Sequence, residues 1–200
     1  MIMNRNQMMH LIKSATSLVQ SEFVYIFNSE SILFNNPKLH ERMFGPSNPT
    51  LALAMWPRDE KMSQKALMVN SAIGRDTKFQ EVFGYCVAFE NDETKAAYKM
   101  LPNGWLNRAV ENKFDNITCF MPSSEDAMAV IMHYESGYSN FTKIKELIEN
   151  CSFFDFKKFK KSINGLDVND ERKSFYIDIV NKMMAADFGN DIVEGNRPDI

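Results

Sequence analysis

The residue types that most often form metal or catalytic sites are few and scattered in this chain. His10, His40 and His133 lie far apart, and none has a second histidine four residues away to complete a zinc-binding helix face. Asp59 and Glu60 are adjacent, so their carboxylates would point to opposite sides of an extended segment. We therefore expect surface or hydrogen-bonded side chains here, and no metal site.

The cysteines give no sign of a disulfide framework or a thiolate metal site. Cys86, Cys119 and Cys151 are odd in number, widely spaced and free of any C-x-x-C pair. Cys86 and Cys119 fall in apolar, strand-like segments, which predicts small core residues. A reducing cytoplasm is the expected setting, and no metal or other cofactor is expected.

Aromatic and basic residues alternate between residues 153 and 161. The aromatic members are Phe153, Phe154, Phe156 and Phe159, and the basic members are Lys157, Lys158, Lys160 and Lys161. Such alternation occurs on nucleic-acid-binding surfaces, but helical spacing favours a buried aromatic face with lysines reaching solvent. A third interpretation is an interface, because so many phenylalanines exceed what one small helical layer readily hides. From it we expect protein contacts through residues 153–200.

Composition narrows the class of partner. The chain has 200 residues, is 44% hydrophobic and carries a net charge of −3, so it can bury a core and has no global attraction to polyanions. Binding to nucleic acid is therefore not expected. No long apolar segment is present, so neither a signal peptide nor a membrane span is expected. The richness in Met, Asn, Lys, Phe and Ile is typical of an AT-rich genome, such as that of a phage or of a low-GC bacterium.

The elements that would position a site alternate between helices and strands up to about residue 122. Apolar spacing predicts helices over 8–19 and 61–73, the second ending at Gly74. Short apolar runs predict strands over 23–27, 51–56, 84–89 and 117–121, with 23–27 and 51–56 neighbours in one mixed sheet. Ser29 could cap a short helix through Leu33.

Beyond Pro122 the pattern becomes helical. Ser123, Ser124, Glu125 and Asp126 suit the first turn of a helix, and amphipathic segments follow at 141–148 and 175–184. These patterns predict an α/β (α+β) part over 1–122 and a helical part over 123–200. The polar end, 187–200, has a composition that normally frays.

Several blocks in order resemble one known family. They are FVYIFNSESIL at 23–33, WPR at 56–58, SAIG at 71–74, FQEVFGY at 79–85, LPNGW at 101–105 and residues 119–126. In this order the chain resembles a bacterial nucleotidyltransferase-like family of uncharacterised function. That family is related to abortive-infection and toxin–antitoxin nucleotidyltransferases and, distantly, to DNA polymerase β. The resemblance implies a nucleotidyltransferase-like mixed sheet flanked by helices.

The resemblance also implies a two-metal site that this sequence has lost. In such a fold a Gly-Ser turn holds phosphate, and two acids one residue apart on the next strand hold Mg²⁺. Here the Gly-Ser positions read Asn28 and Ser29, the acid positions read Ala52 and Ala54, and Ile131 stands where the family has a lysine. Scaffold positions are kept while ligand positions are replaced, which predicts a protein without catalytic residues.

The expected function is a structural, assembly or protein-binding role, for instance in a phage particle. Two alternatives remain open. One is an active nucleotidyltransferase with relocated acids, for which Asp59 and Glu60 are the candidates. The other is an antitoxin-like protein that binds a nucleotide beside Ser29 without turnover. The setting would be the cytoplasm, or the virion if a phage encodes the chain.

Overall fold

A computed structural model describes residues 3–27, 31–35, 50–55, 60–134, 138–150 and 154–185, the side chains of residues 33, 35 and 138–143 excepted. Several residues considered above lie outside this part of the chain: Asn28, Ser29, His40, Trp56, Asp59, Cys151, Phe153 and the segment 187–200.

The described residues contain one five-stranded mixed sheet in the order β3-β2-β1-β5-β4. The strands are β1 (Phe23–Ile26), β2 (Thr50–Met55), β3 (Cys86–Phe89), β4 (Val110–Phe114) and β5 (Ile117–Met121). Strand β1 runs antiparallel to β2 and parallel to β5. The chain therefore has an α/β (α+β) fold, and the prediction that segments 23–27 and 51–56 are neighbours is confirmed.

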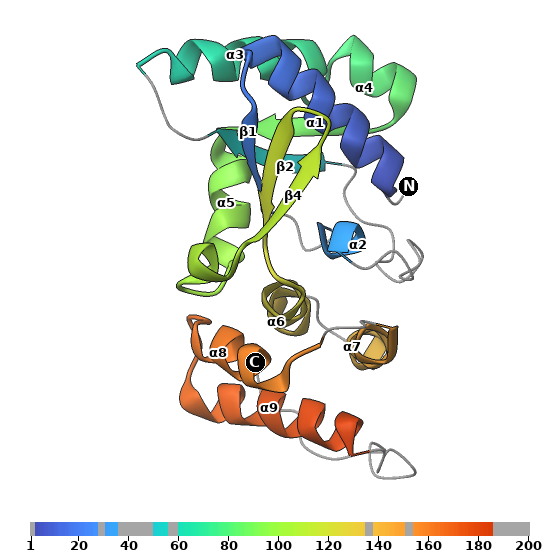
Figure 1. Ribbon diagram of the computed structural model, residues 1–200, viewed down its shortest axis with the longest axis vertical. Coiled ribbons are helices and arrows are strands. Elements are labelled where there is room, and N and C mark those ends of the chain that lie inside the picture. Colours follow the sequence, from blue (N-terminus) through green and yellow to red (C-terminus); the bar gives the residue numbers. More distant parts are fainter. Residues whose placement is uncertain are drawn as a thin grey trace.

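Helices cover the two faces of the sheet unequally. The helices α1 (Arg5–Val19), α3 (Met62–Ile73) and α4 (Lys78–Phe83) lie together on one side, while α5 (Asp92–Met100) lies on the other against β2 and β3 (Figure 1). Helix α1 begins earlier than predicted, because Asn4 and Gln7 form a reciprocal capping box at its first turn.

The helical part lies beyond the end of β5. It comprises α6 (Ser124–Tyr134), α7 (Tyr138–Asn150), α8 (Phe156–Asn164) and α9 (Asp170–Met184), with α8 and α9 farthest from the sheet (Figure 1). In the described ranges, no helix combines the length and the apolar character needed to cross a membrane.

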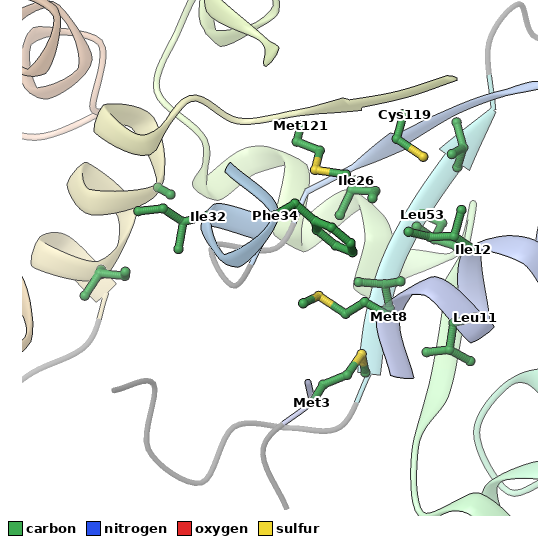
Figure 2. Close-up of a cluster of buried hydrophobic side chains, with 14 of the residues drawn as sticks. Met3, Met8, Leu11, Ile12, Ile26, Ile32, Phe34, Leu53, Cys119 and Met121 are labelled. Atoms are coloured by element: carbon green, nitrogen blue, oxygen red, sulfur yellow. The ribbon is translucent and has the colours of Figure 1, made fainter. Parts of the chain in front are cut away.

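The two predicted parts share one hydrophobic cluster. It contains Met8 and Leu53 from the sheet side and Phe159 and Val180 from the helical side. The short helix α2 (Ile32–Asn35) joins them, with Ile32 between the sheet core and α6 (Figure 2). Residue 122 is therefore a change in architecture within a continuous core.

Some elements were not predicted. Helices α4 and α5 and strand β4 are short segments that mix charged and apolar residues, and the apolar patterns that indicated the other elements did not single them out. Strand β3 begins at Cys86 and not at Gly84. Gly84 has a φ of 75° and ends α4 in the left-handed conformation that glycine adopts without strain.

Candidate functional site

The alanines at the predicted acid positions lie on the face of β2 that α5 covers. Ala52 and Ala54 are 5% and 6% exposed and share a small cluster, whereas Leu51 and Leu53 belong to the main core on the opposite face. Alternate residues of a strand face opposite sides. The backbone thus keeps the spacing that would place two carboxylates side by side, but the side chains are methyl groups.

Trp105 occupies the space next to these alanines. It follows Gly104, whose φ of 76° lets the chain turn into the short helix η3 (Trp105–Arg108). The Trp105 ring is 3% exposed and packs edge-on against Phe27, 5.6 Å between centroids, and against Tyr98, 6.1 Å. The small side chains of β2 make room for this indole. A cluster of aromatic and small apolar side chains therefore covers this face of β2.

Ile131, the third position considered with these alanines, lies apart from them. Ile131 is 1% exposed and belongs to the main cluster, while its neighbour Val130 packs in the cluster of Ala52 and Ala54. Asn28 and Ser29 lie outside the described residues. Ala52, Ala54 and Ile131 are thus buried packing residues in two different clusters.

A buried ion pair holds the start of α6 to the end of η3. Arg108 donates through Nε and Nη2 to the Asp126 carboxylate at 2.7–3.1 Å, and the Ser123 hydroxyl donates to the same carboxylate at 3.0 Å. The Asp126 side chain is 0% exposed and that of Arg108 is 20% exposed. The Asp126 backbone N–H in turn donates to Ser123, completing a helix cap. The sequence indicated the cap, but nothing in it pointed to Arg108.

A second buried carboxylate ties α6 to α8. Glu125 is 4% exposed and accepts a hydrogen bond of 3.0 Å from the backbone N–H of Asp155, the N-cap residue of α8. Asp155 itself accepts from the backbone N–H groups of Lys157 and Lys158. Asp126 thus links the helical part to Arg108 of the sheet part, and Glu125 links two helices within the helical part, so both carboxylates are engaged in structural contacts.

Two consecutive hydrogen bonds connect α9 to the end of α6. Arg172 Nε donates to the Tyr176 hydroxyl at 3.0 Å, which leaves the hydroxyl hydrogen free to be donated to His133 Nδ1 at 3.3 Å. Burial, and then the nearby Arg172, lower the pKa of His133 below its ordinary value. The imidazole is therefore held neutral, with Nδ1 as an acceptor.

The other sequence candidates are structural. His10 contacts the Tyr85 hydroxyl at 2.8 Å within an aromatic group on α1 and α4. Cys86 and Cys119 are both fully buried, as predicted, and burial raises the pKa of the Cys119 thiol to about 12. Glu60 is exposed. No group of three or more His, Cys, Asp or Glu side chains within the described ranges is placed to hold a metal ion.

The sheet face beyond α5 is open and aromatic. Phe23 is 45% exposed, and Tyr25 and Phe120 are half-buried and stacked at 5.0 Å on neighbouring strands. Next to them on β4, Glu111 and Lys113 pair with each other at 3.2 Å. We call these five residues the open sheet face. The run from Phe23 to Phe27 is apolar or aromatic at every position, so its sequence did not distinguish this partly exposed face of β1 from the buried one.

The aromatic and basic segment divides between two faces of α8. Phe159 is 0% exposed in the main cluster, so the expectation that it contributes to an interface is corrected: it is part of the intramolecular core. Phe154 and Phe156 are half-buried against the same cluster. Lys157, Lys158, Lys160 and Lys161 are all exposed, as the helical interpretation requires.

Comparison with protein families, with curated proteins and with solved structures gives no match for this chain.

Proposed function

We propose that this chain is a non-catalytic protein built on a nucleotidyltransferase-like scaffold, which binds another protein within a larger assembly. The observation that carries the proposal is the packing of Trp105 and Phe27 over Ala52 and Ala54. Two-metal chemistry needs oxygen ligands and room for ions and phosphate at such a position. Here buried hydrophobic side chains occupy that position and stabilise the fold. The proposed setting is the cytoplasm, or the virion of a phage.

The surface proposed for the partner is the open sheet face. Three aromatic rings from β1 and β5 are accessible there, and aromatic side chains contribute much of the binding energy in protein interfaces. The charged neighbours Glu111 and Lys113 pair with each other, and burial raises the pKa of Tyr25, so its hydroxyl stays neutral. A weakly charged aromatic surface favours an apolar protein surface as its occupant.

The test compares the assembly state of the full chain with that of two variants in its native context. Phe23→Thr with Phe120→Thr removes two rings while keeping residues that favour strands. Leu67→Gln with Val82→Thr is the matched control, since it removes exposed apolar side chains, 71% and 63% exposed, from α3 and α4. Native mass spectrometry should find the parent chain and the control in a complex, and the sheet variant as a free 23.1 kDa chain.

Two results would contradict the proposal. One is a parent chain that stays monomeric at high concentration in its native context, or a sheet variant that keeps the complex. The other is transfer from a labelled nucleoside triphosphate in the presence of Mg²⁺. Loss of that transfer in Glu60→Ala would favour the enzyme with relocated acids.

A further inference from the structure

The four lysines of α8 form one continuous exposed surface, which we call the lysine face. At 3.6 residues per turn, Lys157, Lys158, Lys160 and Lys161 fall within an arc of about 160° and span about 6 Å along the axis. Phe159 lies opposite them, fully buried in the core. The helix is thus fixed to the fold by its apolar side and presents the lysines outward.

These lysines differ from most others on the surface because they have no carboxylate partner among the described residues. Elsewhere, lysines are paired with acids on their own or a neighbouring element, at Lys13–Asp115, Lys78–Glu81, Lys95–Asp92, Lys113–Glu111, Lys145–Glu149 and Lys182–Asp178. In α8, Asp155 is used to cap the backbone, and Lys160 lies over the Phe156 ring at 4.6 Å. Like charges three and four residues apart weaken a helix. Repulsion among the four lysines therefore destabilises α8 unless an anion binds to them.

Acidic residues bound the lysine face along the chain. Asp155 precedes the lysines, and exposed Asp167, Asp170 and Glu171 follow the end of α8. The chain as a whole has a net charge of −3. A long, uniform polyanion such as a nucleic acid would extend past one turn of helix and meet these acids. A short acidic segment could contact the lysines without reaching these acids.

We propose that the lysine face binds a short carboxylate-rich segment of a partner protein. The surface is separate from the open sheet face, and its occupant is recognised by charge complementarity. Insertion of α8 into a membrane is disfavoured, because Phe159 and Ile163, which would enter the lipid, are fully buried in the core. Lysine suits this task as a flexible point charge that several carboxylate arrangements can satisfy.

The experiment measures binding of a fluorescent oligoglutamate peptide to the full chain by anisotropy at low salt. Changing the four α8 lysines together to glutamine should weaken binding by about tenfold or more, and changing them to arginine should preserve it. The matched control changes Lys13, Lys78, Lys95 and Lys145 to glutamine, which alters the net charge equally. Its binding should stay within about twofold of the parent. Circular dichroism should show that all variants keep the parent fold, since the changed side chains are exposed.

Three outcomes would overturn the proposal. The peptide could fail to bind at low salt. The two glutamine variants could lose affinity equally, which would show that net charge alone is responsible. A single-stranded oligonucleotide with the peptide's number of charges could bind more tightly and depend on the α8 lysines, which would make the lysine face a nucleic-acid surface.

Discussion

Replacing Arg108 with methionine should strongly destabilise the fold, because it leaves the Asp126 carboxylate buried without its cation. Asp126 is 0% exposed and takes its ionic hydrogen bonds from Nε and Nη2 of Arg108. Removing one partner of a buried pair costs about 3–5 kcal/mol, against about 0–1 kcal/mol for a surface pair. Arg108 is itself 20% exposed, so we expect a loss of about 3 kcal/mol at neutral pH. Domains of this kind are stable by about 5–15 kcal/mol in total.

Urea denaturation followed by circular dichroism measures this loss directly. Asp126→Asn keeps an acceptor for Ser123 and leaves Arg108 partly solvated, so it should cost about 1–2 kcal/mol. The double variant should be more stable than Arg108→Met alone, because no buried charge remains. If Arg108→Met costs under about 1 kcal/mol and the two changes simply add, the pair behaves as a surface contact and the reasoning is refuted.

Three further predictions follow from the buried groups. Ala54→Asp should unfold or severely destabilise the chain in a thermal melt, since it buries a carboxylate against Trp105; retained stability would show free space there. Burial holds the pKa of His133 below its unfolded value, so its contribution to stability is complete above the unfolded pKa and is lost as pH falls toward the folded pKa. Melting temperatures of the parent should therefore fall from pH 7.5 to 5.5 more than those of His133→Gln, and equal falls would contradict this. The Cys119 thiol, with its pKa raised to about 12, should resist alkylation at pH 8 until the protein unfolds, as peptide mass spectrometry would report; rapid labelling of the native protein would show that it is accessible.

Much of the fold could be predicted because its core elements have strong local patterns. The runs at β1, β2 and β5 are apolar and rich in strand formers, and α1 carries an apolar stripe and an N-terminal cap. Helix α5 could not be predicted in this way, because its sequence DETKAAYKM is largely polar. Its position depends on tertiary contacts, including a hydrogen bond from the Thr94 hydroxyl to the Ala88 carbonyl. Sequence periodicity does not report such contacts.

The candidate surfaces were less accessible to sequence reasoning. The alanines of β2 were identified from their positions in the pattern of the family that the sequence resembles. Trp105 lies some 50 residues farther along the chain and packs beside them only after folding, so the sequence did not indicate it. The pairing of Arg108 with Asp126 is also a product of tertiary structure. For α8, helical spacing separated buried Phe159 from exposed lysines, but it could not show that those lysines have no acidic partner within the part of the chain that the structure describes.

The proposed function requires that aromatic side chains fill the covered face of β2 and leave no room there for a nucleotide. The chain has two tryptophans, so the Trp105 indole N–H can be assigned readily in a nitrogen-15 correlation spectrum. Because Trp105 packs against Ala52 and Ala54, any ligand entering there must shift its signal. Titration with Mg²⁺ and a non-hydrolysable nucleoside triphosphate should leave the chemical shift of that signal unchanged. The indole proton should continue to exchange slowly with solvent. A saturable change in the chemical shift of the Trp105 signal would show that a nucleotide binds there, and would contradict the proposed function.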